Sequence, residues 1–109
     1  MADELVITIY QKTKNFPADE QFGLVQQIRR SAVSVPSNIV EGCYRQSQKE
    51  FIRFLEIAYS SLKECHYQIN ISGRLGYLDS QTHDLLDHKI TEAEKVLIAF
   101  YKFQKKNIQ

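Results

Sequence analysis

The spacing of hydrophobic residues predicts helices along the whole chain. Apolar side chains recur every three or four positions, as in Val25, Ile28, Ala32, Val35 and Ile39. This period places them on one face of a helix, whereas a strand would alternate. The four predicted helices cover about Ala2 to Lys14, about Asp19 to Tyr44, the stretch between the Ser47 and Gly76 signals, and Asp79 or Ser80 to about Gln104. No segment has the pattern of a strand.

Capping residues and prolines mark the boundaries of these helices. Ser47-Gln48-Lys49-Glu50 is a capping box, and Gly76 is placed to be the left-handed residue that ends the same helix. Pro17 separates the first two helices, because proline disfavours helix at the residue before it. Pro36 lies inside the second helix, where we expect a kink and no termination, since apolar spacing continues to Ile39.

Four antiparallel helices with short loops predict an all-α fold. The expected architecture is an up-down-up-down four-helix bundle, a single domain over residues 1–109 with a short first helix and a Pro-kinked second helix. The first helix, at about 20 Å, is long enough to cover only the near half of the second. We therefore expect Pro36 to Arg45 to be solvated or closed by a neighbouring subunit.

Composition narrows the class of protein. Hydrophobic residues make up 43% of the chain and charged residues 25%, with a formal net charge of +1, which excludes intrinsic disorder and a uniformly basic protein. No apolar run is long enough for a membrane span, and the start of the chain lacks a signal-peptide pattern, so a cytoplasmic protein is expected. Cys43 and Cys65 are predicted to be reduced, core-type thiols.

A polar cluster surrounds Pro36 and resembles an active site at first sight. Its members are Ser34, Pro36, Ser37, Asn38 and Glu41. A serine nucleophile needs a neighbouring base, and the three histidines are remote in sequence. We interpret the cluster as structural, with the serines and Asn38 satisfying backbone groups freed by the kink and Glu41 pairing with an arginine. No catalytic residue, metal ligand, cofactor or small-molecule substrate is predicted, and the protein is not expected to be an enzyme.

The last helix has a second apolar face beside its core stripe. It consists of Leu85, Val96, Ala99 and Phe103. So wide an apolar arc exceeds what one bundle face requires, which favours contact between copies of the chain. The alternative is a helix deeply buried within its own bundle.

Antiparallel packing predicts an uneven distribution of charge. The start of the third helix lies at the same end as the last turns of the second and fourth, and residues 41–53 and 95–106 together give this end a charge of about +5. The candidate phosphate-binding residues there are Arg45, Lys49, Arg53, Lys102, Lys105 and Lys106. RNA or DNA is the first predicted partner. The alternative is a scaffold whose same end docks an acidic protein.

Several motifs, in one order along the chain, resemble a known bacterial family. They include Phe16-Pro17, Phe22-Gly23-Leu24, Arg29-Arg30, Ser34-Val35-Pro36-Ser37-Asn38-Ile39, Glu41-Gly42, Lys49-Glu50-Phe51 and Leu75-Gly76-Tyr77-Leu78. The sequence is similar to the four-helix-bundle proteins encoded within intervening sequences of 23S ribosomal RNA genes. The resemblance implies a ring-like homo-oligomer, a pentamer in relatives, with a suggested role in nucleic-acid binding and no known catalytic activity.

Overall fold

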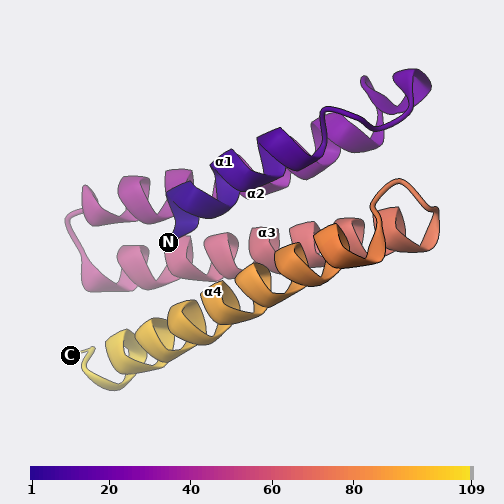
Figure 1. The fold of residues 1–109 in the computed structure, drawn as a ribbon. Coiled ribbons are helices and arrows are strands. Elements are labelled where there is room, and N and C mark those ends of the chain that lie inside the picture. Colours follow the sequence, from indigo (N-terminus) through magenta and orange to yellow (C-terminus); the bar gives the residue numbers. More distant parts are fainter. Residues whose placement is uncertain (109) are drawn as a thin grey trace.

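The computed structural model describes residues 1–108 and consists of four α-helices, the first of them short (Figure 1). They are α1 (Ala2–Lys12), α2 (Leu24–Cys43), α3 (Gln48–Arg74) and α4 (Ser80–Lys106), with a 3-10 turn, η1 (Ala18–Glu20), before α2. Within the described residues there is no strand. Neighbouring helices run antiparallel, and α1 packs against both α2 and α4. The predicted all-α, up-down-up-down bundle with a short first helix is confirmed.

The ends of α3 and the start of α4 have the predicted capping geometry. The Ser47 hydroxyl accepts a hydrogen bond from the Glu50 amide at 3.1 Å. Gly76 has a φ of 80°, and the amide of Tyr77 donates to the Ser72 carbonyl at 2.9 Å, which is a Schellman motif. The Asp79 carboxylate accepts from the Thr82 amide at 2.7 Å, and this bond lowers the pKa of Asp79.

One hydrophobic core runs along the bundle axis. Its fully buried members include Ile9, Val25, Ile28, Leu55, Leu62, Ile69, Leu86 and Ile90. The stripes predicted for α2, α3 and α4 supply most of these side chains. The small residue Gly42 lets α2 approach α3 closely, since a Cβ there would lie 2.8 Å from the Cβ of Phe54.

The second helix begins later than predicted, at Leu24 and not near Asp19. Pro17 is extended, with a ψ of 146°, and the chain after it makes only the short turn η1. The Glu20 side chain is committed to other contacts, because it accepts from the Tyr77 hydroxyl at 3.0 Å and from the Leu24 amide at 3.4 Å. The sequence around Asp19 therefore forms the entry to α2. Beyond that entry, α2 continues through Pro36 to Cys43 without interruption.

The shortness of α1 leaves one half of the bundle uncovered. The N-terminus lies near the middle of α2 in Figure 1, and the far half of α2 and α4 extends beyond it. Val40 is 56% exposed and Phe100 is 40% exposed, although Phe100 belongs to the apolar stripe of α4. The prediction that Cys43 is a core thiol is wrong, because Cys43 is exposed although its neighbour Gly42 is buried against α3. Cys65 is buried as predicted, and burial raises the pKa of its thiol to about 11.

Candidate nucleic-acid interface

The first turns of α3 present two cations to solvent. The Ser47 cap fixes the start of the helix, and Lys49 and Arg53 follow at positions i and i+4, hence on one face. Both side chains are exposed and neither forms an ion pair with another of residues 1–108. The helix dipole disfavours cations in the first turn, so helix stability does not explain Lys49.

The end of α4 lies against the start of α3. The Gln48 carboxamide donates to the carbonyl oxygen of Gln104 at 3.3 Å and to its side-chain oxygen at 3.0 Å. The ammonium group of Lys105 lies 3.3 Å from the hydroxyl of Tyr101 and 5.6 Å from its ring centre. That hydroxyl donates to a Glu56 carboxylate oxygen at 3.1 Å, which connects α4 back to α3.

A shallow depression of about 480 Å³ follows this seam between α3 and α4. Its lining residues are Lys49, Glu50, Ile52, Arg53, Glu56, Tyr101, Lys105 and Ile108. Three cations thus outnumber two carboxylates around one tyrosine ring. We call this surface the basic seam. Its charged side chains are solvent-exposed, so their attraction for an anion is screened as the salt concentration rises.

The other three predicted cations lie outside the basic seam. Arg45 pairs with Glu41 at 2.9 Å and lies 4.8 Å over the ring of Phe54, so its guanidinium is occupied beside the α2–α3 turn. Lys102 and Lys106 are exposed on α4 and make no ion pair with another described residue. The structure therefore brings together Lys49, Arg53 and Lys105, and separates Arg45 from them.

The polar cluster near Pro36 forms a local hydrogen-bond chain. The Asn38 carboxamide donates to the Ser34 carbonyl at 2.8 Å and to the Ser34 hydroxyl at 2.9 Å. That hydroxyl lies 2.9 Å from the hydroxyl of Ser61 on α3. Ser37 is exposed. Among residues 1–108 no histidine hydrogen-bonds to this cluster. His66 pairs with Asp87 and Glu94, and His83 with Asp84 and Asn70.

His66 connects α3 to α4 through two carboxylates. Its Nε2 lies 2.6 Å from Asp87 and its Nδ1 lies 2.9 Å from Glu94, which also pairs with Lys63 at 3.4 Å. Partial burial lowers the pKa of His66, but the two hydrogen-bonded carboxylates outweigh it and raise the pKa above its usual value. The two carboxylates bind different ring nitrogens of His66, so the three side chains form an ion-pair network. They do not converge on one point where a metal ion could bind. Among residues 1–108, no group of three or more His, Cys, Asp or Glu side chains could hold a metal ion.

The second apolar face of α4 is exposed. Leu85 is 41% exposed, Val96 54% and Phe103 61%, and Ala99 is exposed as well. The alternative interpretation, a helix buried on that side within its own bundle, is wrong, because all four side chains are exposed in the subunit. This face is called the α4 apolar face below.

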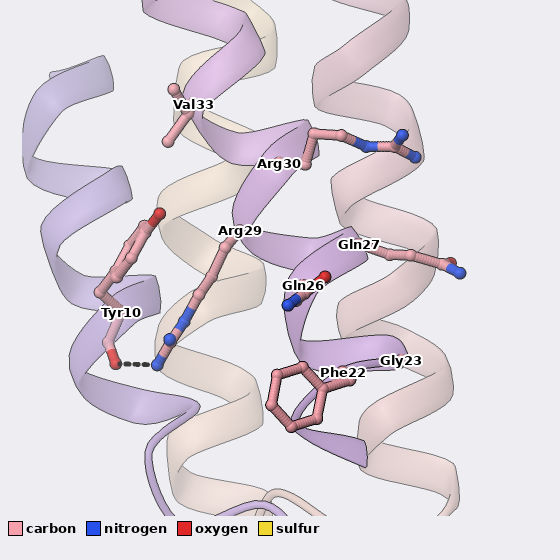
Figure 2. Close-up of a pocket in the computed structure, with 8 residues that line it drawn as sticks. All are labelled: Tyr10, Phe22, Gly23, Gln26, Gln27, Arg29, Arg30 and Val33. Carbon is pink, nitrogen blue, oxygen red and sulfur yellow. Dashed lines mark hydrogen bonds between the residues drawn. The ribbon is translucent and has the colours of Figure 1, made fainter.

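A further surface was not identified from the sequence. It is a depression of about 640 Å³ over the first half of α2, next to Tyr10 of α1 (Figure 2). Phe22, Gln26, Arg29 and Arg30 are among its lining residues. The signal that could have revealed it is the absence of any Asp or Glu between residues 21 and 40, a stretch that contains two arginines. We call it the α2 depression.

Comparison with known proteins places the chain among relatives of the same size. Residues 1–99 match a family model described as 23S rRNA-intervening sequence protein. A solved structure from Bacteroides thetaiotaomicron VPI-5482, a protein of unknown function from the S23 ribosomal protein family, is 29% identical with a TM-score of 0.83. The similarity covers 93% of this chain and 94% of that one. A comparison with curated protein sequences gives no match. No helix in the described part of the chain is long and apolar enough to cross a membrane.

Proposed function

Because the chain belongs to the 23S rRNA-intervening sequence protein family, we propose that it is a non-enzymatic, homo-oligomeric helical bundle whose basic end binds the phosphate backbone of RNA or DNA. The observation that carries this proposal is the basic seam. Lys49 and Arg53 have no ion-pair partner among the described residues and lie beside Lys105 and the Tyr101 ring. Helix-dipole complementarity explains Lys105 and Lys106 in the last turn of α4, but it does not explain Lys49. Phosphate binding would explain why unpaired cations occupy these positions.

The contacts expected here position a polyanion and do not read its sequence. Long, mobile lysine and arginine side chains bind phosphate oxygens, which every nucleotide carries. The seam offers few hydrogen-bond groups in a fixed arrangement, so discrimination between bases is not expected. A ring of subunits would repeat the same charges around an axis and strengthen their field.

Removing the two unpaired cations of the seam is expected to weaken nucleic-acid binding. We expect the double variant Lys49→Gln/Arg53→Gln to bind a labelled RNA about tenfold more weakly, with a salt dependence shallower by about one to two units of log–log slope. Filter binding between about 50 mM and about 200 mM salt measures both quantities. The control Lys89→Gln/Lys95→Gln removes two cations of α4 that line neither depression, and it should leave the affinity within about twofold of wild type. If the wild-type protein shows no affinity at low salt, or an affinity that salt does not change, the proposal is wrong.

The α4 apolar face supports the homo-oligomer. Val96 and Phe103 are more than half exposed in the subunit. Burying such a side chain completely from full exposure is favourable by about 1.5–3 kcal/mol, and roughly half of that remains to be gained at each position. A ring-like, pentameric assembly, as described for the family, is the form we propose. Each copy would then place its basic end around a common axis.

Placing charges on this face is expected to dissociate the assembly. The variant Val96→Glu/Phe103→Glu should sediment as a 12.7 kDa monomer, while the wild-type protein sediments at a multiple of that mass. Both side chains are exposed in the subunit, so the helical content measured by circular dichroism should not change. Tyr67→Glu, at a residue 66% exposed on α3, is the matched control and should leave the mass unchanged. A wild-type monomer at micromolar concentration would contradict the assembly.

A protein-interaction scaffold is the second candidate function. It is favoured by apolar groups at the same end, since Phe103 is 61% exposed and Ile108 is 38% exposed beside the basic seam. An acidic protein with an apolar contact surface would fit both features. A pull-down from cell lysate with and without nuclease separates the two functions, because only a scaffold retains its partner after nuclease treatment.

A further inference from the structure

The α2 depression differs from the basic seam in its charge. Its eight lining residues, all within residues 1–108, are Tyr10, Phe22, Gly23, Gln26, Gln27, Arg29, Arg30 and Val33. Two of them are arginines and none is a carboxylate. No carboxylate lines the depression, whereas Glu50 and Glu56 line the seam. The nearby Glu20 carboxylate is already engaged, since it accepts from the Tyr77 hydroxyl and the Leu24 amide.

The two arginines of the depression have different roles. Arg29 is fixed, because its Nε donates to the Thr13 hydroxyl at 3.0 Å, a terminal nitrogen donates to the Tyr10 carbonyl at 3.2 Å, and its guanidinium lies 4.5 Å over the Tyr10 ring. Figure 2 shows Arg30 projecting from α2 on the side away from Tyr10. Arg30 has no ion pair or side-chain hydrogen bond to another described residue and is exposed. Arg29 supplies a fixed positive charge, and Arg30 is free to bind.

The depression also contains an exposed aromatic ring, that of Phe22. Phe22 is 86% exposed, and its ring lies beside Gln26 on the outer face of α2 (Figure 2). It makes no ring contact with another aromatic residue of the described chain. The carboxamides of Gln26 and Gln27 likewise form no hydrogen bond with another of residues 1–108. Such a carboxamide offers a donor and an acceptor to a ligand.

We propose that the α2 depression binds an unpaired nucleotide of single-stranded nucleic acid, with its base stacked on Phe22 and its phosphate bound by Arg30. The carboxamide of Gln26, beside the ring, hydrogen-bonds to the edge of the stacked base. Arg29, whose guanidinium is held by Thr13 and Tyr10, adds electrostatic attraction for the phosphate. The inference rests on the proposed function for its class of ligand, but it uses different residues, at the opposite end of a molecule 49 Å long.

The geometry favours a single strand over a duplex. The faces of the bases in a duplex are already stacked on one another, so the Phe22 ring can stack only on a base that is unpaired or at a strand end. An acidic protein segment would satisfy the arginines but would leave the exposed ring and the two carboxamides without a specific role. The flat ring, the carboxamide and the guanidinium match the face of a base, the edge of that base and a phosphate.

The test compares variants of Phe22 and Arg30 on three probes: a labelled single-stranded oligoadenylate RNA, a blunt duplex of the same length, and AMP as competitor. Phe22→Ala is expected to weaken binding of the single strand by about tenfold or more, since stacking on one aromatic side chain typically contributes that much. Phe22→Tyr keeps a ring and should stay within about twofold of wild type. Duplex binding should not depend on Phe22. Arg30→Gln should weaken single-strand binding and reduce the salt slope by about 0.7.

The controls separate this inference from the proposed function. Tyr67→Ala removes a ring that is 66% exposed on α3 and should leave single-strand binding unchanged. If Lys49→Gln/Arg53→Gln weakens binding while Phe22→Ala does not, the inference is wrong and the basic seam stands. If the reverse holds, the inference stands and the seam proposal is wrong. Binding of neither RNA by the wild-type protein overturns both.

Two further outcomes identify the ligand more closely. Competition by AMP that depends on Phe22 supports a site for one nucleotide, whether free or within a strand, and a single strand that competes more strongly than AMP places the site on the polymer. Binding of polyglutamate with the same dependence on Phe22 and Arg30 would assign the depression to an acidic protein segment and overturn the proposal.

Discussion

Replacing Ile9 by alanine is expected to destabilise the protein by about 3 kcal/mol, because three carbon atoms are lost from a fully buried side chain and a cavity remains. Ile9 is 0% exposed and anchors α1 in the hydrophobic core. Urea denaturation of the variant and the wild type measures the loss. Ile7→Ala, two positions away at a residue 58% exposed, is the matched control and should change the free energy of unfolding by less than about 0.5 kcal/mol.

The loss should appear first in α1. A helix of 11 residues is too short to be stable alone, so α1 depends on its docking through Leu5 and Ile9 and on the bonds from Arg29. Hydrogen exchange should therefore accelerate in the amides of α1 well before those of α3, which has 27 residues and contacts both α2 and α4. Equal exchange in α1 and α3 of the Ile9→Ala variant, or an effect no larger than that of Ile7→Ala, would contradict this account.

The helices and their core could be predicted because both depend on local signals. Apolar spacing in α3 places Leu55, Leu62 and Ile69 on one face, and the structure buries all three. The Ser47 cap and the left-handed Gly76 each act within a few residues, so sequence alone locates them. The start of α2 was missed because it depends on a distant contact, the hydrogen bond between Glu20 and Tyr77.

Exposure at the uncovered half was harder to predict residue by residue. The short first helix led to the expectation that Pro36 to Arg45 would be exposed, yet Cys43 was still assigned to the core from its spacing. Periodicity tells which side chains share a face, and it does not tell whether another helix reaches that face. Phe100 on α4 shows the same effect, since it is on the core stripe but remains 40% exposed.

The candidate interface could be predicted only at the level of helix ends. Antiparallel topology correctly places the start of α3 beside the end of α4, as the bonds between Gln48 and Gln104 demonstrate. It could not separate Arg45 from Lys49, because that depends on the direction in which the chain turns after α2. Arg45 is directed to Phe54 and Glu41 instead. The α2 depression was missed because Phe22 lies in the turn before α2, where helical periodicity has no meaning.

Removing His66 is expected to cost about 2 kcal/mol near pH 6, because two charge-assisted hydrogen bonds between α3 and α4 are lost. Glu94 has a side chain only 11% exposed and would retain just its contact with Lys63, so a buried carboxylate would be left poorly paired in the His66→Ala variant. Asp87, 44% exposed, would return to solvent at little cost. The free energies of unfolding of both proteins in urea give the difference.

This difference should shrink as the pH rises. The folded-state pKa of His66 is raised above its unfolded value of 6.5, so the stabilisation is complete below about pH 6.5 and is lost as the pH rises through the folded-state pKa. Above the folded-state pKa, the neutral imidazole carries only one N–H. It can then donate to Asp87 or to Glu94, but not to both. The groups that face His66 are Asp87 and Glu94 on α4, with Lys63 on α3 joined to Glu94.

The pH series, with a second histidine variant, tests whether the loss of stability is specific to the charge of His66. Wild type and His66→Ala are compared at about pH 6 and at about pH 9, where the carboxylates stay ionised throughout. His88→Ala, at an exposed histidine of α4, is the matched control, and its difference from wild type should be small at both pH values. A His66→Ala loss that stays constant or grows with pH would show that His66 acts by packing and not through its charge.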